Sequence, residues 1–345
     1  MECCLGAKGT DGEAAAPSGG HHEYFDPFLM SSMLKSGIAT AAAAGISVAL
    51  ATSIFRRRLL ERHGVATTLS KYLRMRYALS GGWNTILPLA DFDRTITTAT
   101  CGTSCHGVVE SCKELSVEYR KNTKQLFAKY FPIELDPVMP ITEKIPLMQD
   151  WYRQAHELLL KEPLTPALLD ATAASSKAAL RPGFDEFYAR CLGHGAPLVV
   201  CSAGLGNVVK ALLQHRLESP AAVSSIGSLP IVSNWLTFDG KDHVNGFSQP
   251  LLHMFNKNGT FIREQIGATR WKELSAGRSV CLLLGDGLGD ASMADGLGLT
   301  SVVKIGFLNE TDPIRVAERL PQYEAAFDAV ILHDRSFAFI LSLLD

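Results

Sequence analysis

The sequence predicts an α/β fold in which a Rossmann-like core with a parallel sheet carries an inserted helical domain. Apolar runs that suit buried strands end in polar residues three times, at Asp91, at Ser202 and at Asp286. Between the first two runs, residues 101–180 place their apolar side chains at helical spacing instead. Ligands of open α/β sheets bind at the carboxyl ends of the strands, so these polar residues are the candidates for chemistry.

Length and composition agree with one large domain and a smaller one. The chain has 345 residues, of which 47% are hydrophobic and 20% charged, enough to bury a full core. Its formal net charge of −2 gives no reason to bind a nucleic-acid polymer, and we expect a monomer. The eight cysteines are scattered, which indicates reduced thiols in a cytoplasmic protein. Cys101, Cys105, His106 and Cys112 lack the spacing of a standard zinc site, so we assign no zinc to this segment.

The N-terminal part differs in character from the rest. Residues 1–35 are rich in Gly, Ala, Ser and charge without periodicity, which predicts a disordered tail. Residues 36–55 then run without a charge for the length of a helix that spans about 30 Å, and three arginines follow. Two alternatives stay open for segment 36–60. It is a membrane anchor that holds the rest of the chain on the cytoplasmic side, or a surface or disordered helix, since much of it is alanine.

The first polar motif is Asp91-Phe92-Asp93-Arg94-Thr95, directly after an apolar run. Two carboxylates two residues apart at the end of a strand point to the same side. They can hold a divalent cation between them while one of them attacks a phosphorus atom. For so short a motif, the alternative is a polar turn after a buried strand.

A second motif repeats this design near the C-terminus. The apolar run 279–284 leads into Gly285-Asp286, in a turn that several glycines make permissive, and Asp290 follows four residues after Asp286. Mg²⁺ takes about six oxygen ligands and keeps some of its waters, so three acids from two strand ends suffice for a site. Solvated acids in a glycine-rich turn are the alternative.

Between these motifs, further residues suit phosphate binding. The run 197–201 predicts a strand that ends at Ser202, before a helix. A serine hydroxyl at a helix N-terminus forms a phosphate cradle with free N–H groups such as that of Ala203, and a plain N-cap is the alternative. Lys257 can supply the positive charge that a phosphate needs, or lie on the surface as most lysines do.

The order of these motifs resembles the haloacid dehalogenase superfamily of phosphotransferases. More narrowly, the chain resembles the pyrimidine 5′-nucleotidase family of cytosolic eukaryotic nucleotidases (the cytosolic 5′-nucleotidase III type) from about residue 62 to the C-terminus. The matching segments are Asp91-Phe92-Asp93-x-Thr95, Cys105-His106, Glu134-x-Asp136-Pro137, Trp151-Tyr152-x-x-x-His156, Ser202-Ala203-Gly204-x-Gly206, Val232-Ser233-Asn234, Phe255-Asn256-Lys257, Gly285-Asp286-x-x-Gly289-Asp290 and Met293-Ala294-Asp295-Gly296.

The resemblance implies a domain organisation. Residues 62–100 and 181–345 would form a haloacid dehalogenase-like catalytic core with a parallel sheet. Residues 101–180 would form a helical cap domain inserted into it. Such a cap closes over the substrate, excludes water from the reacting phosphate and contributes contacts to the base.

Three cap residues are candidates for binding the nucleotide base. The resemblance implies that Glu134 accepts hydrogen bonds from the base, and Trp151 and Tyr152 can stack on it. Without the resemblance, a solvated acid and core aromatics are the alternatives. The family has a serine where this chain has Ala155, which removes a hydroxyl near the nucleotide and puts base preference in question. Arg94 stands where the family prefers an apolar residue.

A mechanism follows from these residues as a hypothesis. Asp91 attacks the phosphorus to form an aspartyl-phosphate, and Asp93 acts as general acid and then as general base. Mg²⁺ is bound by Asp91, by Asp286 and by the backbone carbonyl of Asp93. Ser202 and Lys257 hold the phosphoryl oxygens.

Asp290 has a supporting role, in which it orients Lys257 or a metal-bound water. We therefore expect a Mg²⁺-dependent 5′-nucleotidase that hydrolyses pyrimidine nucleoside 5′-monophosphates, UMP and CMP. The alternatives are a 7-methylguanosine-phosphate nucleotidase, and a phosphatase or phosphotransferase of the same superfamily that acts on a non-nucleotide phosphate ester.

Overall fold

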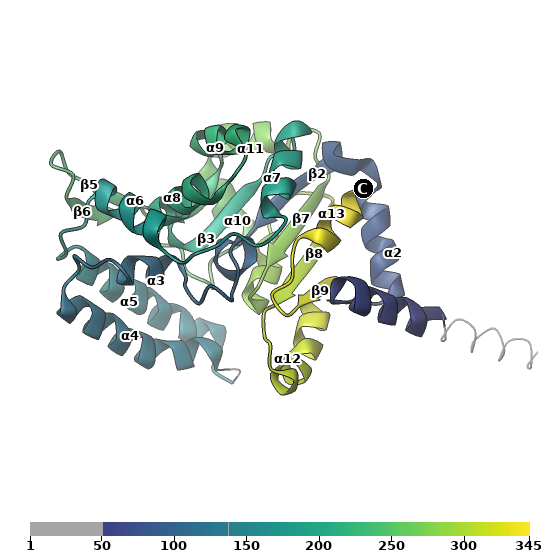
Figure 1. The fold of residues 1–345 in the computed structure, drawn as a ribbon, viewed down its shortest axis with the longest axis horizontal. Coiled ribbons are helices and arrows are strands. Elements are labelled where there is room, and N and C mark those ends of the chain that lie inside the picture. The colour runs from purple at the N-terminus through teal and green to yellow at the C-terminus, as the bar shows by residue number, and fades with distance from the viewer. Residues whose placement is uncertain (1–50, 137) are drawn as a thin grey trace, which may run out of the picture. The chain divides into compact units, whose positions relative to one another are not determined.

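The computed structural model describes residues 51–136 and 138–345 (Figure 1). The predicted tail and most of the uncharged stretch of residues 36–55 lie outside the described residues. The described end of that stretch belongs to a helix over residues 51–63. Among the helices of the described chain, none combines the length and the apolar character that a bilayer crossing needs.

Seven strands form the central sheet: β1 (Val65–Ala66), β2 (Ile86–Ala90), β3 (Val199–Leu205), β4 (Ile231–Asn234), β7 (Val280–Gly285), β8 (Ser301–Leu308) and β9 (Ala329–Leu332). Their order across the sheet is β1-β9-β8-β7-β2-β3-β4. Neighbouring strands run parallel except at one edge, where β1 pairs antiparallel with β9. The predicted parallel sheet is thus confirmed, with one antiparallel strand added.

Helices cover both faces of this sheet. Successive residues of a strand point to opposite faces, and in β2 both sets are apolar: Ile86 and Ala90 join one hydrophobic cluster, Leu87 and Leu89 the other. The first cluster is completed by α2 (Leu69–Ala78), α7 (Phe184–Gly193), α8 (Gly206–Arg216), α9 (Pro220–Ser225) and α13 (Ala338–Leu344), and the second by α10 (Gly259–Ile266), α11 (Ala268–Ser275) and α12 (Pro313–Ala326).

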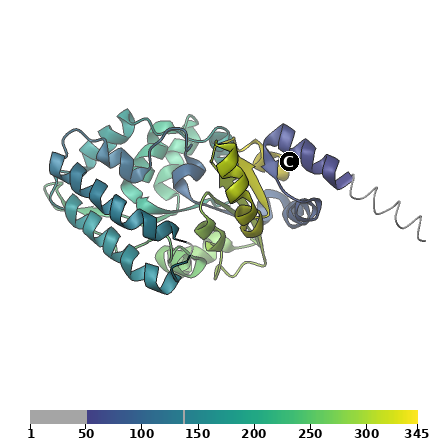
Figure 2. The ribbon, with the colours of Figure 1, turned by 90° about the horizontal axis from the view of Figure 1, so that it is seen from below.

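The segment between β2 and β3 contains α3 (Cys105–Glu110), α4 (Val117–Leu135), α5 (Ile141–Leu159) and α6 (Pro166–Ser175). The long helices α4 and α5 lie side by side (Figure 2). Ser104, Ser116 and Thr165 start α3, α4 and α6, because each side-chain oxygen accepts a backbone N–H of the first turn. These helices occupy the segment that we expect to form a cap, and their closing motion stays a prediction.

A hairpin that the sequence reading did not include joins this helical segment to the core. It consists of β5 (Leu236–Phe238) and β6 (Val244–Phe247), which pair antiparallel. The backbone N–H of Val244 donates to the carbonyl of Leu164 at 3.2 Å, in the loop before α6. The available sequence signal was Asp239-Gly240, a pair typical of tight hairpin turns.

Candidate active site

Three central strands bring the predicted catalytic residues together. β2 ends directly before Asp91 and β7 directly before Asp286, while Ser202 lies within β3. Because β2 is flanked by β7 and β3 in parallel, the carboxyl ends of all three meet at one edge of the sheet. Asp91, Asp286 and Asp290 each offer a carboxylate oxygen, and these atoms lie within 4.8 Å of one another.

Lys257 provides the positive charge of this cluster. Its Nζ lies 2.5 Å from Asp91 Oδ1 and 2.8 Å from Asp290 Oδ1, and the residue is only 5% exposed. The other oxygen of Asp290 accepts the backbone N–H groups of Asp286, at 3.1 Å, and Gly287, at 2.9 Å. Asp290 is therefore engaged in holding both the lysine and the turn. This geometry supports its assignment as a residue that orients Lys257.

The three carboxylates have the properties of a cation site. Burial raises the pKa of Asp286 well above its usual value, and the charges of Asp91 and Asp290 add to the rise. Asp91 Oδ2 is buried and accepts no hydrogen bond from the described chain. A divalent cation would offset the repulsion and supply the missing partner, and carboxylate oxygens are preferred ligands of Mg²⁺. These residues therefore fit the predicted metal.

Asp93 is held by the start of α3. Its Oδ1 accepts the backbone N–H of Cys105 at 2.9 Å. Burial raises the pKa of Asp93, although this hydrogen bond and the neighbouring His106 oppose the rise. A carboxyl group with a raised pKa holds its proton nearer to neutral pH, as a general acid requires.

Ser202 is placed differently from the prediction. β3 continues beyond it to Leu205, because after an irregularity in register Leu205 pairs with Asn234 of β4, and α8 begins only at Gly206. Within the strand, the buried Ser202 Oγ accepts the backbone N–H of Gly204 at 3.1 Å. Ser202 is thus a strand residue and not a helix N-cap.

The residue after Ser202, Ala203, is fixed from the neighbouring strand. Asn234 of β4 donates from Nδ2 to the carbonyl of Ala203 at 3.0 Å and to that of Leu252 at 2.8 Å. Asn234 is itself only 1% exposed. The phosphate-binding candidates therefore lie on a strand end that a buried side chain holds in place.

We expect Ser202→Ala to lower kcat/KM about 10- to 100-fold, since a hydrogen bond to a charged group contributes about 1.5–3 kcal/mol. Steady-state kinetics of phosphate release measures the change. Ser224→Ala is the matched control, because the Ser224 hydroxyl only donates within its own helix, to the carbonyl of Pro220 at 2.8 Å. A Ser202→Ala enzyme as active as this control would remove Ser202 from the phosphate site.

A buried arginine, which sequence reasoning missed, holds the loop after Asp91. Arg94 has a left-handed backbone, with φ at 62°, which is uncommon for a residue with a side chain. Arg181 donates to the carbonyl oxygen of Arg94 and, at 2.7 Å, to that of Thr95. It also forms an ion pair of 2.9 Å with Asp334, and both side chains are buried. No periodic pattern marks a single buried arginine.

Glu134 lies half-buried near the end of α4. Burial raises its pKa to about 7, although the positive charges of Lys144 and Arg94 oppose the rise. Lys144 is held close by because its Nζ donates to the backbone carbonyl of Glu134 at 3.0 Å. Arg94 directly follows the two aspartates of the first motif. Because its charge affects the pKa of Glu134, Glu134 lies within electrostatic reach of the loop after Asp91.

The two aromatic candidates have different surroundings. Burial raises the pKa of Tyr152, and the charges of Glu134 and Asp93 contribute to the rise, so Tyr152 lies within electrostatic reach of both. Trp151 stacks on Tyr130 of α4, with ring centroids 5.8 Å apart and planes at 12°. The structure thus brings Tyr152 near the predicted catalytic residues Asp91 and Asp93. Trp151 packs between two helices, and its contact with a base stays a prediction.

His156 is a further buried residue of α5, for which the sequence offered no role. Its ring stacks on Phe247 of β6 with centroids 3.6 Å apart, which joins the hairpin to the helices. Burial lowers its pKa to about 3, so the ring is neutral at physiological pH. Within the described chain, its Nε2 is buried without a hydrogen-bond partner. It is therefore a candidate for contact with a ligand.

A family model described as pyrimidine 5′-nucleotidase (UMPH-1) matches residues 92–345. The matched range begins directly after Asp91 and contains Asp93, Ser202, Lys257 and Asp286. It covers more than half of the chain.

Individual relatives agree with the family model. The 7-methylguanosine phosphate-specific 5′-nucleotidase A of Xenopus laevis is 33% identical over 271 residues, which cover 76% of this chain and 88% of the relative. The 7-methylguanosine phosphate-specific 5′-nucleotidase of Drosophila melanogaster is 36% identical over 272 residues, with 76% and 80% covered. Among solved structures, cytosolic 5′-nucleotidase IIIB bound to cytidine superimposes with a TM-score of 0.71 at 30% identity, covering 84% of this chain and 95% of that one.

Proposed function

Because this chain belongs to the pyrimidine 5′-nucleotidase family and is thus a phosphoric monoester hydrolase, we propose that it hydrolyses nucleoside 5′-monophosphates with the help of Mg²⁺. The observation that carries the proposal is the buried cluster in which Lys257 contacts Asp91 and Asp290 next to Asp286. One cation and three acids at the ends of adjacent strands suit the binding and transfer of a phosphoryl group.

Asp91 and Asp93 carry the chemical steps. Asp91 attacks the phosphorus, so that a carboxylate oxygen–phosphorus bond forms and the bond to the 5′-oxygen breaks. Asp93 gives its proton to the departing 5′-oxygen. Water then attacks the phosphorus, Asp93 takes a proton from it, and Asp91 leaves as a free carboxylate. The products are a nucleoside and phosphate.

The remaining polar residues position the phosphate. Lys257 and Ser202 hold phosphoryl oxygens as negative charge shifts during the reaction, and Asp290 orients Lys257. Asp91, Asp286 and the carbonyl oxygen of Asp93 would hold Mg²⁺, which would supply positive charge to offset the repulsion between carboxylates and phosphate. Helices α3 to α6, as a cap, exclude water from this site.

For the substrate, we expect 7-methylguanosine 5′-monophosphate as well as the pyrimidine nucleotides CMP and UMP. The two curated relatives described above are named for the methylated nucleotide, whereas the family model is named for pyrimidines. A methylated guanine ring carries positive charge, and Glu134 offers it a carboxylate. The test is Mg²⁺-dependent phosphate release from these three nucleotides, AMP and a sugar phosphate. Turnover of the sugar phosphate alone would contradict a nucleotidase.

Glu134→Gln is expected to raise KM for a preferred nucleotide about tenfold or more while kcat for a generic phosphate ester stays within about twofold. The carboxylate is a stronger hydrogen-bond acceptor than an amide, and a charge-assisted bond contributes about 1.5–3 kcal/mol. Steady-state kinetics on CMP and p-nitrophenyl phosphate measures both. Glu143→Gln, an exposed acid at the start of α5, is the control. An equal loss of kcat/KM on both substrates would place Glu134 in the chemistry and not in base recognition.

The pKa of Glu134 leads to an expected pH dependence. With a value of about 7, this carboxyl group is mostly protonated at pH 6 and mostly ionised at pH 8. Ionisation strengthens its acceptance of a hydrogen bond from the cytosine amino group, so KM for CMP should fall severalfold across this range. The phosphate group of CMP also titrates in this pH range, but it does so equally for both enzymes. Dividing the KM of the wild type by that of Glu134→Gln at each pH therefore removes its contribution. A KM ratio between the two enzymes that does not change with pH would exclude this role.

We infer a cytoplasmic, monomeric enzyme, in keeping with the cytosolic structural relative. Size-exclusion chromatography measures the oligomeric state. For residues 36–55 the two alternatives are separated by carbonate extraction of membranes from cells that express the full chain. An anchored chain stays in the pellet, whereas a peripheral or free chain is released.

A further inference from the structure

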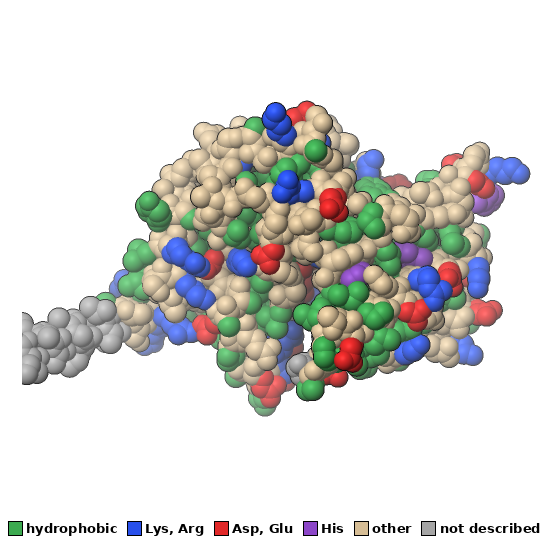
Figure 3. Space-filling model, turned by 180° about the vertical axis from the view of Figure 1, so that it is seen from behind, with side chains coloured by type: hydrophobic (Ala, Val, Ile, Leu, Met, Phe, Trp, Pro, Cys, Tyr) green, Lys and Arg blue, Asp and Glu red, His purple; other side chains and the backbone are tan. Residues whose placement is uncertain are grey.

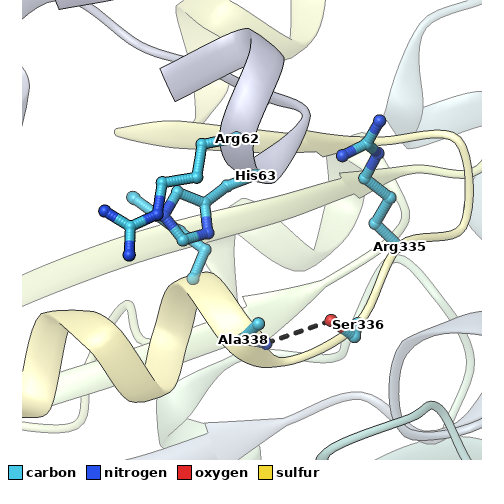
Figure 4. Close-up of a pocket in the computed structure, with 6 residues that line it drawn as sticks. Arg62, His63, Arg335, Ser336 and Ala338 are labelled. Atoms are coloured by element: carbon cyan, nitrogen blue, oxygen red, sulfur yellow. Dashed lines mark hydrogen bonds between the residues drawn. The ribbon is translucent and has the colours of Figure 1, made fainter. Parts of the chain in front are cut away.

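A hollow of about 240 Å³ lies apart from the catalytic cluster. Figure 4 shows that its labelled side chains come from two segments, the end of the helix over residues 51–63 and the stretch 335–338, which leads into α13 and includes its first residue. Its walls belong to the same compact unit of the chain. The lining residues are Arg62, His63, Arg335, Ser336, Ala338 and Phe339.

The ionisable side chains of the lining are all basic. The lining contains two arginines and a histidine and no acidic residue. Within the described part of the chain, the guanidinium groups of Arg62 and Arg335 have no hydrogen-bond or ion-pair partner. Burial lowers the pKa of His63, and the positive charges of Arg62 and Arg335 lower it further, so the three groups lie within electrostatic reach of one another.

Two other arginines of the same helix, unlike Arg62, form ion pairs with acidic residues. Arg56 pairs with Glu324, and Arg57 pairs with Glu61 at 2.7 Å. Figure 3 shows several Lys and Arg side chains on the surface around this helix, at the left of the view. Acidic partners are thus present on this part of the surface, but none lines the hollow.

Arg335 is held in position from two sides. A Cβ atom at Gly64 would lie 2.4 Å from Cδ and Nε of Arg335, so the arginine stem rests directly on the glycine, whose φ of 61° is in the left-handed region. The carbonyl oxygen of Arg335 accepts Nη1 of the buried Arg181 at 2.8 Å. The preceding residue, Asp334, forms the ion pair with the same arginine. The backbone of Arg335 is therefore anchored, and the stem of its side chain packs on Gly64.

Ser336 adds a neutral donor to the hollow. Its Oγ accepts the backbone N–H of Ala338 at 3.3 Å, so its own O–H is available to donate (Figure 4). The hollow is thus lined by two arginines, a serine and a histidine, residue types whose N–H and O–H groups can donate to a phosphate, although the guanidinium groups of Arg62 and Arg335 point in different directions in Figure 4. Phe339, 2% exposed, closes the hollow on the apolar side.

We propose that the hollow between Arg62 and Arg335 is a second phosphate-binding site, separate from the catalytic centre. Its ligand is a phosphate group with open oxygens. Two sources share this chemistry, a small phosphate in solution and the headgroup of an anionic phospholipid. The two sources differ in whether binding needs a membrane surface, so one pair of measurements distinguishes them.

The first measurement counts inorganic phosphate bound to the full chain in equilibrium dialysis. The double variant Arg62→Gln/Arg335→Gln, which keeps the stem on Gly64, is expected to bind one phosphate fewer than the wild type. Arg58→Gln is the matched control, because this exposed arginine of the same helix does not line the hollow. Lys257→Met removes the catalytic phosphate instead, so loss at the hollow and loss at the catalytic centre are counted separately.

The second measurement is co-sedimentation with phosphatidylserine vesicles, with phosphatidylcholine vesicles as reference. Insertion of an apolar N-terminal segment alone would bring the chain down with both kinds of vesicle. Loss of phosphatidylserine binding in the double variant, with the phosphate count unchanged, assigns the site to lipid headgroups. Loss of one phosphate without a change in sedimentation assigns it to a small phosphate. A double variant equal to Arg58→Gln in both measurements overturns the proposal, provided that its thermal unfolding matches that of the wild type.

Discussion

Asp91→Asn is expected to abolish phosphate release, lowering kcat by at least about 10⁴-fold, the scale seen when a nucleophile is removed. The amide of asparagine is a poor nucleophile and a weaker cation ligand than a carboxylate. It also loses the charge that faces Lys257 at 2.5 Å. The side chains have nearly the same shape, so the fold should stay intact. Single-turnover phosphate release measures the effect, and circular dichroism checks the fold.

Asp290→Asn is the informative comparison, because Asp290 also contacts Lys257 but has only a supporting role in the proposed mechanism. Its Oδ1 lies 2.8 Å from Lys257 Nζ, and its Oδ2 accepts two backbone N–H groups of the turn. We expect it to retain turnover that Asp91→Asn lacks. An Asp91→Asn enzyme with turnover close to that of the wild type would refute the aspartyl-phosphate mechanism.

Arg181→Met is expected to lower the free energy of unfolding by about 3–5 kcal/mol, the cost of breaking a buried ion pair on one side. The substitution leaves the carboxylate of Asp334 buried without its cationic partner, with the backbone N–H groups of Ala99 and Thr100 as its remaining donors. It also leaves the carbonyl oxygen of Thr95 without its donor and removes one of the two donors to the carbonyl oxygen of Arg94, which keeps Asn309 Nδ2 at 2.8 Å, so the loop that follows Asp91 loses support. Urea unfolding followed by circular dichroism measures the change, and kcat is expected to fall with it.

A surface arginine provides the control for this substitution. Arg190→Met removes two ion pairs between partly exposed side chains, one with Glu186 at 2.7 Å and one with Asp345, and such pairs contribute about 0–1 kcal/mol each. If Arg181→Met costs no more than Arg190→Met, the buried pair does not support the catalytic loop.

Much of the sheet could be predicted from the sequence. The strands that carry Asp91 and Asp286 follow runs of apolar residues, because both faces of a parallel sheet are buried and nearly every position must then be apolar. The glycines around Asp286 indicated a turn there. The candidate site followed from these strand ends, since polar residues after buried strands meet at one edge of the sheet.

Other features depend on contacts that no local pattern encodes. The strand of Ser202 runs on to Leu205 because β4 pairs with it beyond an irregularity in register. Arg181 is buried because Asp334, far away in the sequence, faces it at 2.9 Å. The hairpin β5–β6 is short, and it contacts the helical segment through the stack of Phe247 on His156, a residue of α5 that is far away in the sequence.

The sequence by itself determined the fold class and the family, and it supplied the candidate residues for the chemistry. Only the tertiary structure decided which partners those residues have: Lys257 between Asp91 and Asp290, Tyr152 near the catalytic residues, and Trp151 packed on Tyr130. The reason is physical. Apolar periodicity reports which face of one element is buried, because burial acts on each element separately. A hydrogen bond or ion pair depends on the position of two side chains, and for Lys257 and Asp91, 166 positions apart, folding of the whole chain sets that distance.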